Sequence, residues 1–321
     1  MTYAMSGEIE FPAVRDRQKI TIRRFSSVKI DSNRKNLTDT ATIVLPRRVK
    51  DFDRFDIKNV FQTGDPVIIR LGYDGELHTE FEGYIAQVST YVPVVIDCED
   101  EMFQLKRKTV SISRASCSLK ELLKAVAGEY PIECDEIPIG SVRYANKLVS
   151  EILDDLKEKM KLYSYFRGKT LFSGRASNTG TRIAVVVEKQ ASDSLKDKNV
   201  EKVMVRVESL QWVKKKGQKR KLIAMKGEKS GQVITIKQPN LTQIEIERIA
   251  NDLYTKAKQP GLDGELTLFG VPRLEHGMIV DLSSYLYEER NGSYYIDSVV
   301  KSVEIGQGYR QVAKLGNKTT M

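Results

Sequence analysis

Two histidines, His78 and His276, are the first residues to test for catalytic chemistry in this chain of 321 residues. His78 falls beside a predicted hairpin turn in "GYDGELHTEF", and His276 falls just before a predicted strand in "PRLEHG". Neither lies at the spacing of a metal-ligand set. The HExxH zinc motif and the GxSxG serine motif are both absent. These residues therefore predict no catalytic site and no metal site.

A second candidate is "GKT" at 168–170, which resembles the end of a phosphate-binding loop. That loop requires a glycine five residues before Gly168 and a helix after the motif. The required position holds Tyr163, and "YSYFRGKTLFSGR" is typical of a hairpin that turns near Arg167-Gly168. The sequence predicts no cofactor site, and we expect no enzymatic activity.

The three cysteines are Cys98, Cys117 and Cys134, spaced 19 and 17 residues apart without a CxxC pair. An odd number at such spacing favours buried thiols in a reducing compartment. The N-terminal stretch has no basic region followed by an apolar core, and no run approaches the length of a membrane span. We therefore expect neither export by a standard signal nor a transmembrane segment.

Charge is concentrated in one place: the chain has 52 basic and 43 acidic residues, but residues 214–229 alone contribute +7 of the net +9. We interpret this run as the tip of a hairpin with "LIAMKG" as the returning strand. Its candidate partner contacts are Lys214, Lys215, Lys216, Lys219, Arg220 and Lys221. The alternative is a solvated hairpin end that protects an exposed edge. Only Trp212 is near, so the aromatic residues typical of single-strand nucleic-acid binding are missing.

A regular strand pattern occupies "NLTDTATIVLPRR" at 36–48, with alternating apolar and hydroxyl-bearing positions. Asp39 breaks the apolar face, which otherwise continues to Leu45. Its carboxylate either caps the preceding turn or meets an arginine or backbone N–H groups of a neighbouring subunit. Pro46 removes a ladder donor and ends the strand.

The elements predict a mainly β (α+β) fold: two related tube-type β-barrel domains with an inserted small α/β domain. We expect a first barrel at 1–110, the inserted domain at 111–178 and a second barrel at 179–321 that carries one helix at 241–258. Capping boxes predict two helix starts, Ser118 with Glu121 and Thr242 with Glu245. A further helix is predicted over 146–162, and Asp74-Gly75 predicts a hairpin turn.

A weak internal repeat links the two β regions. In the first, Gly64 lies 21 residues before the Ile of a Tyr-Ile-x-x-Val motif, and in the second, Gly277 lies 19 residues before it. Each glycine is followed three residues later by a valine. Two related barrels explain this pattern, and chance similarity between amphipathic hairpins is the alternative.

With these pieces in place, "NLTDTATIVLPRR" and "GDPVIIRLGYDGELHTEFEGYIAQVS" resemble the N-terminal barrel of phage tail baseplate hub proteins. These form the late control protein D family, which is related to the hub portion of type VI secretion spike proteins. "PGLDGELTLFGVPRLEHGMIVDLSS" and "GSYYIDSVVKSVEIGQGYRQVAKL" are similar to that family's closing barrel. The matching positions are Pro272, Leu274, Gly277, Tyr294, Ile296, Val299, Gly308 and Tyr309.

The resemblance implies a homotrimer whose six barrels adapt a three-fold spike to a six-fold tail tube. It further implies a separate spike protein, a tail tube protein and other baseplate components as partners, without a cofactor. The location implied is the virion tail baseplate of a phage, a prophage or a related contractile injection system, after synthesis in the bacterial cytoplasm.

Three hypotheses remain from the sequence. The first is this structural hub. The second is a nucleic-acid-binding protein with OB-like barrels and a basic hairpin, which the local charge disfavours. The third is a tail-associated cell-wall hydrolase, for which the sequence offers no motif.

Overall fold

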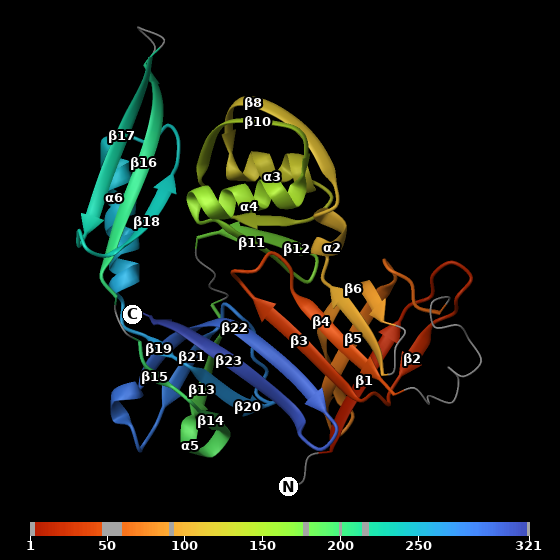
Figure 1. Ribbon diagram of the computed structural model, residues 1–321. Helices are drawn as coiled ribbons and strands as arrows, with labels where there is room; N and C mark the ends of the chain where they lie inside the picture. Colours follow the sequence, from red (N-terminus) through yellow and green to blue (C-terminus); the bar gives the residue numbers. More distant parts are fainter. Residues whose placement is uncertain are drawn as a thin grey trace. The chain divides into compact units, whose positions relative to one another are not determined.

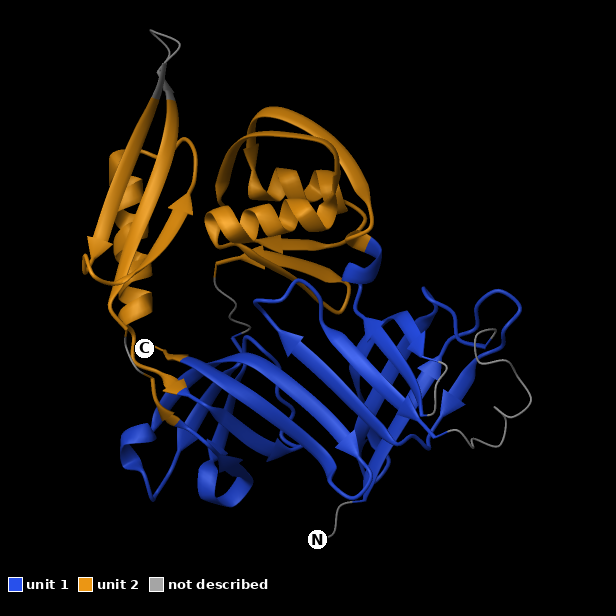
Figure 2. Ribbon diagram, in the orientation of Figure 1, with its two compact units in different colours: residues 1–104, 178–195, 263–316 blue, residues 105–177, 196–262, 317–321 orange. Residues whose placement is uncertain are grey.

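The computed structural model describes residues 4–46, 60–89, 93–175, 180–198, 201–213 and 218–319, without the side chains of 212–213 and 218–219. Two compact units are present (Figure 2). Unit 1 comprises 1–104, 178–195 and 263–316, and unit 2 comprises 105–177, 196–262 and 317–321. This division differs in two respects from the three consecutive domains that we expected: the two β regions form one unit, and residues 196–262 group with 105–177. Most of residues 196–262 fold into a separate sheet and helix with a core of their own.

Unit 1 is built from strands, and it forms two groups that we call the N-module and the C-module (Figure 1). The N-module holds β1 (Met5–Phe11), β2 (Ile20–Ile22), β3 (Ser27–Asn33), β4 (Thr40–Leu45), β5 (Pro66–Tyr73), β6 (Glu76–Ser89) and β7 (Val94–Glu99). Helix α2 (Met102–Leu105) follows β7. The C-module holds β13 (Arg182–Val186), α5 (Val187–Gln190), β14 (Ala191–Asp193), β20 (Glu265–Phe269), β21 (Ile279–Ser283), the 3₁₀ turn η2 (Glu288–Arg290), β22 (Gly292–Glu304) and β23 (Gly308–Lys318).

Both modules place their strands in the same order. The N-module runs β3-β4-β7-β6-β5-β1, with β2 added beside β1, and the C-module runs β14-β20-β23-β22-β21-β13. One difference is that β1 pairs antiparallel with β5, whereas β13 pairs parallel with β21. In the described residues β22 also pairs with β3, which joins the modules into one sheet of 13 strands.

The two glycines of the sequence repeat make the same backbone contacts. Gly64 N–H donates to the carbonyl of Ile85 at 2.8 Å, and Gly277 N–H donates to the carbonyl of Ile296 at 2.8 Å. Both glycines have positive φ, 92° and 84°, where a side chain is disfavoured. The repeat read from the sequence is therefore a repeat of backbone geometry.

The hairpins that follow these glycines also share their register. Pro66 lies opposite Tyr84 in the N-module, and Ile279 lies opposite Tyr295 in the C-module. The N-module hairpin turns at Asp74-Gly75, as predicted, with φ values of 53° and 87° that suit a two-residue turn. The C-module hairpin instead has a longer connection, which contains η2.

Alternation of side chains explains the core of unit 1. In β4, Ala41, Ile43 and Leu45 are buried, and Thr40 on the other face is exposed. Val303 and Tyr309 of the C-module belong to the same buried cluster as the N-module residues. The apolar core is therefore continuous from one module to the next.

Unit 2 contains two α/β groups. The first holds β8 (Thr109–Ser118), α3 (Leu119–Ala127), β9 (Ile132–Cys134), β10 (Pro138–Leu148), α4 (Val149–Met160), β11 (Tyr163–Arg167) and β12 (Thr170–Gly174). The second holds β16 (Val203–Val213), β17 (Gln218–Gly227), β18 (Gln232–Lys237) and α6 (Gln243–Lys258), flanked by the short strands β15 (Lys196–Asp197) and β19 (Leu262–Asp263). Both predicted capping boxes are confirmed, at Ser118 and at Thr242. The predicted hairpin at 167–168 is confirmed as well.

Candidate functional site

The residues that could do chemistry do not gather into a reactive centre. His276 is buried, and its Nε2 lies 3.9 Å from Oδ2 of Asp39. His78 lies on β6, a distant part of the sequence. Among the residues that the structure describes, no group of His, Cys, Asp and Glu is arranged to hold a metal ion. The three cysteines are free, and burial raises the pKa of the Cys98 thiol.

Asp39 lies where the chain turns from β3 into β4. Its Oδ1 accepts a hydrogen bond from the Asn33 N–H at 3.2 Å, across the turn. Its own N–H donates to Oδ2 of Asp100 at 3.2 Å. Burial, together with the neighbouring Asp39, raises the pKa of Asp100 well above its usual value. These bonds are local to the N-module, so we retain turn capping as the proposed role of Asp39.

The basic hairpin is formed by β16 and β17, which pair from Met204–Gly227 to Val213–Gln218. Lys214, Lys215 and Lys216 lie outside the described residues, as does the side chain of Lys219. Arg220 is exposed. Lys221 forms an ion pair with Glu208 at 3.0 Å, and this contact holds the pKa of Glu208 below its usual value. The structure thus shows one local carboxylate that offsets part of the basic charge.

No pattern in the sequence indicates the seam between the modules, where β22 pairs with β3. Residues 298–304 of β22 lie opposite residues 33–27 of β3. On β22, the buried Lys301 forms an ion pair with the buried side chain of Glu80 on β6, which Arg273 also contacts at 3.1 Å. Burial lowers the pKa of Lys301. Charged partners thus hold the seam together inside unit 1.

A second charged contact fixes the same seam near the β3–β4 turn. Asp297 of β22 pairs with Arg34 at 2.7 Å and with Lys35 at 2.9 Å. Burial raises the pKa of Asp297, but these two cations outweigh burial and hold the pKa below its usual value. The pairing is not predictable from sequence because the partners are more than 260 residues apart.

The tip of the β5–β6 hairpin also reaches the C-module, through Tyr73. The Tyr73 hydroxyl accepts from the Gly270 N–H at 3.0 Å and donates to the carbonyl of Tyr309 at 3.1 Å. The two tyrosine rings stack with centroids 5.8 Å apart. Gly270 is required because a Cβ at this position would lie 2.1 Å from the Tyr309 ring. Tyr73 therefore latches one module to the other.

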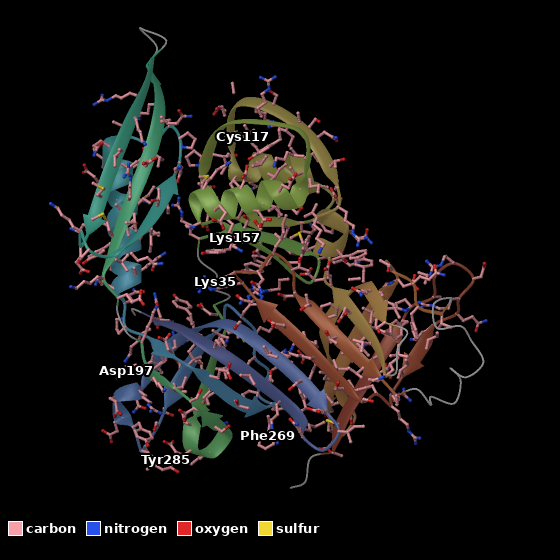
Figure 3. The ribbon with its side chains drawn as sticks, in the orientation of Figure 1. Lys35, Cys117, Lys157, Asp197, Phe269 and Tyr285 are labelled. Atoms are coloured by element: carbon pink, nitrogen blue, oxygen red, sulfur yellow. The ribbon has the colours of Figure 1, made fainter. Side chains whose placement is uncertain are left out.

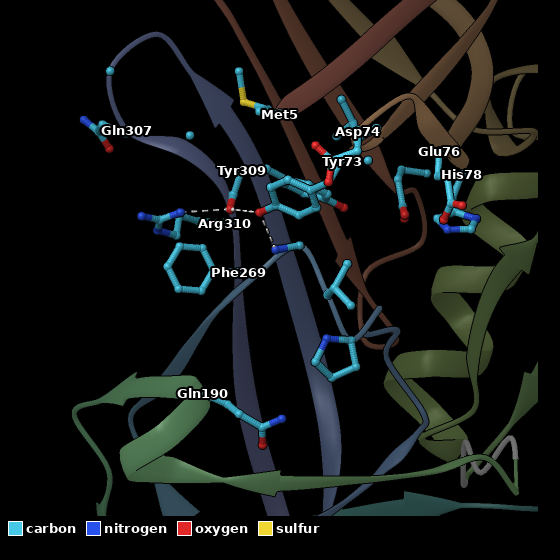
Figure 4. Close-up of a pocket in the computed structure, with 18 of the residues that line it drawn as sticks. Met5, Tyr73, Asp74, Glu76, His78, Gln190, Phe269, Gln307, Tyr309 and Arg310 are labelled. Carbon is cyan, nitrogen blue, oxygen red and sulfur yellow. Dashed lines mark hydrogen bonds between the residues drawn. The ribbon is translucent and has the colours of Figure 1, made fainter. Parts of the chain in front are cut away.

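A groove of about 1330 Å³ surrounds this latch (Figure 4). Its lining includes Met5, His78 and Phe269, with the Arg310 guanidinium 4.2 Å from the centre of the Phe269 ring. Aromatic rings and scattered charged side chains line the groove. Among these lining residues, no nucleophile is hydrogen-bonded to a general base. This composition suits contact with a protein surface better than catalysis.

Two open strand edges in the described part of unit 1 correspond to the two sides of the β22–β3 seam. On one edge β22 pairs first with β21, at 292–295, and then with β3, at 298–304. The repeat aligns Tyr295 of β22 with Tyr84 of β6. The part of β22 that pairs with β3 begins three residues after Tyr295, so its counterpart in β6 begins at Gln87. Within the described part of the chain no strand pairs with that edge at 87–89. The other open edge is β14, which ends the sheet and is the counterpart of β3.

These features make the two edges and the module seam the candidate functional site. An unpaired strand edge offers a row of N–H and C=O groups that can accept a strand from another chain. Among the described helices, none has the length and apolar character needed to cross a membrane. The two open edges and the seam are suited to contacts with other protein chains.

Comparison with solved structures gives matches over nearly the whole chain. A tail protein from Neisseria meningitidis MC58 has a TM-score of 0.67 at 11% identity, over 98% of this chain and 97% of that one. The 43 kDa tail protein of prophage MuSo2 from Shewanella oneidensis has a TM-score of 0.66 at 12% identity, over 97% and 98% of the two chains. Both likenesses concern the fold.

A third match is the E. coli c3393 protein, a component of the type VI secretion system with structural similarity to the T4 tail proteins gp27 and gp5. Its TM-score is 0.59 at 8% identity, over 97% of this chain and 77% of that one. No protein-family model matches the sequence, and no curated protein matches it. The mainly β fold is thus one found in phage tail and secretion-system proteins, which confirms the resemblance at the level of fold.

Proposed function

We propose that this protein is a structural hub subunit of a phage tail baseplate or a related contractile injection machine. In this role it is a homotrimer, its six modules form a ring, and the ring adapts a three-fold spike to a six-fold tail tube. It acts without catalysis. The observation that carries the proposal is the repeated strand order, in which one seam is closed within the chain and its two counterparts are open.

The open edges provide the means of association. Inside one chain, β22 of the C-module pairs with β3 of the N-module. In the repeated strand order, β6 occupies the position of β22, and β14 occupies the position of β3. The equivalent pairing between chains therefore joins β6 of one copy to β14 of the next. Such a head-to-tail contact closes into a ring when its rotation is a whole fraction of a turn. Three chains with two modules each give six similar positions.

The proposed partners follow from this ring. A spike protein on a separate chain binds one face, a tail tube protein binds the other, and other baseplate components surround them. The similarity to tail and secretion-system proteins over nearly the full chain supports this placement in the tail baseplate. Synthesis in the bacterial cytoplasm belongs to the same proposal.

Light scattering after gel filtration tests the proposal. We expect a mass of three times 36.4 kDa, unchanged by added DNA and by moderate salt. A monomer that binds DNA with an affinity that falls steeply with salt would instead support the nucleic-acid-binding alternative, because released counterions dominate such binding.

A further inference from the structure

The connection between β21 and β22 exposes three consecutive apolar side chains. Tyr285, Leu286 and Tyr287 are 62%, 66% and 47% exposed. Tyr285 extends from this loop in Figure 3. Single exposed apolar residues are ordinary, but a contiguous group of large ones marks an interaction surface.

Hydrogen bonds hold this loop in one shape. The Glu188 carboxylate of α5 accepts from the Ser284 hydroxyl and from the N–H groups of Tyr285, at 3.4 Å, and Leu286, at 3.3 Å. The bond from Ser284 holds the pKa of Glu188 below its usual value, so the carboxylate stays ionised as an acceptor. The Ser284 hydroxyl oxygen also accepts from the Tyr287 N–H at 2.9 Å. A loop already ordered in this way loses little conformational entropy when it binds.

The loop is tied to one of the two open edges. The Arg290 guanidinium lies 4.2 Å from the centre of the Tyr287 ring and bonds to Oδ1 of Asp193 at 3.1 Å. Asp193 is the last residue of β14, the edge strand. The apolar loop is therefore continuous with the edge to which we assign the next copy.

The internal repeat indicates what the loop contacts. Tyr73 is seven residues after Pro66, near the tip of its hairpin. Leu286 is likewise seven residues after the aligned Ile279, in the loop at the tip of the C-module hairpin, beyond the end of β21 at Ser283. Tyr73 docks against the neighbouring module of its own chain, at the end of β20 and the start of β23. In the N-module the positions of β20 and β23 are held by β4 and β7. In the proposed ring the module next to the C-module is the N-module of another copy, so we assign the matching surface to that copy.

We propose that Tyr285, Leu286 and Tyr287 form an inter-subunit latch that docks on the β4–β7 pair of the N-module in a second copy of this chain. This inference rests on the proposed function and adds the contact that locks the ring. The exposed carboxylates of Glu288 and Glu289 beside the loop argue against an anionic lipid surface as the occupant.

The test compares Leu286→Glu with Ile305→Glu, a matched control at the β22–β23 tip, where Ile305 is 74% exposed. Sedimentation equilibrium measures the monomer–trimer equilibrium of each, and circular dichroism verifies folding. We expect Leu286→Glu to weaken trimer formation by at least roughly tenfold and Ile305→Glu to leave it unchanged, because only the first buries a charge in the contact.

The outcomes separate the latch from the trimer. A trimeric wild type whose equilibrium is unaffected by Leu286→Glu overturns the latch and leaves the proposed function standing. A monomeric wild type overturns the proposed function. A photo-crosslinker at position 286 gives a second readout. In a mixture of isotopically distinct copies, peptides from β4 or β7 of the other copy support the latch, and links within one copy or to other segments overturn it.

Discussion

At the scale of single residues, unit 1 depends on buried charges that hold its two modules together. Lys301 is 5% exposed, and the side chain of its partner Glu80 is 2% exposed. Moving both ions out of water is costly, so such a pair stabilises the fold only while both partners are present. Lys301 and Glu80 therefore stabilise the seam only as a pair.

The substitution Glu80→Gln tests this pair. It leaves the Lys301 ammonium buried without its carboxylate, and we expect the free energy of unfolding to fall by about 3 kcal/mol. Urea denaturation measures the loss, with Glu76→Gln, an exposed site on the same strand, as the control. The double variant Glu80→Gln with Lys301→Met should lose less than the single variant. If the double variant loses as much unfolding free energy as Glu80→Gln, or more, the buried ammonium is not the cause of the loss.

Asp297 makes the stability of unit 1 depend on pH. Its folded pKa lies below the unfolded value, so its contribution is complete above the unfolded pKa of about 4 and is lost as pH falls through the folded pKa. Asp297→Asn should cost about 1 kcal/mol at pH 7 and flatten the acid limb of a stability profile. The control is Glu304→Gln, at the exposed end of the same strand. Parallel acid limbs for the wild type and Asp297→Asn would contradict this assignment.

Residue contacts were predictable from the sequence only where they are local. The bonds of Ser118 with Glu121 and of Thr242 with Glu245 span one helical turn, and a pattern of residue types predicts them. Asp39 stands out in the sequence because it breaks an apolar face, and a turn cap is one of its expected roles. Its nearness to His276, and the pairing of Lys301 with Glu80, depend on tertiary packing, which local patterns do not encode.

At the scale of elements, α6 begins with a complete capping box. The Thr242 hydroxyl accepts from the Glu245 N–H at 3.3 Å, and Glu245 accepts from the Thr242 N–H at 2.7 Å. Thr242→Ala removes one half of this exchange. We expect a loss of about 1 kcal/mol in the local stability of α6, measured by hydrogen exchange of its amides. Gln243→Ala, at the next position, should leave exchange nearly unchanged, and equal effects of the two changes would reject the cap.

The basic hairpin remains a proposed partner contact. Reversing Lys214, Lys215 and Lys216 to Glu should leave the trimer mass unchanged, because the tip is distant in sequence from the strands of the proposed ring. It should weaken docking of a tail tube or spike protein, measured by co-sedimentation. Reversal of Lys226 and Lys229, in the same segment but away from the tip, serves as the control. Unchanged docking by the tip variant would remove this role.

The elements themselves were largely predictable, since alternation, turn dipeptides and capping boxes each identify a strand, hairpin or helix from a few neighbouring residues. The grouping of 196–262 with 105–177 was not. Two insertions that leave the sheet at different points of the chain form one compact unit, and nothing in the order of elements along the sequence requires this. The pairing of β22 with β3 is not predictable from the sequence for the same reason.

At the scale of the whole molecule, the duplicated module is the central feature. The glycine contacts, the hairpin register and the strand order agree between the two modules, although their sequences share only a few positions. Within one chain, the seam is formed by the pairing of β22 with β3. The equivalent edges on β6 and β14 are open, which is the condition for adding the same seam between chains.

Negative-stain electron microscopy of the purified chain tests this account most directly. We predict rings in which six similar lobes surround a three-fold axis, with alternating lobes contributed by the N-module and the C-module. Isolated particles of one chain, or two-fold dimers that close without a ring, would contradict it.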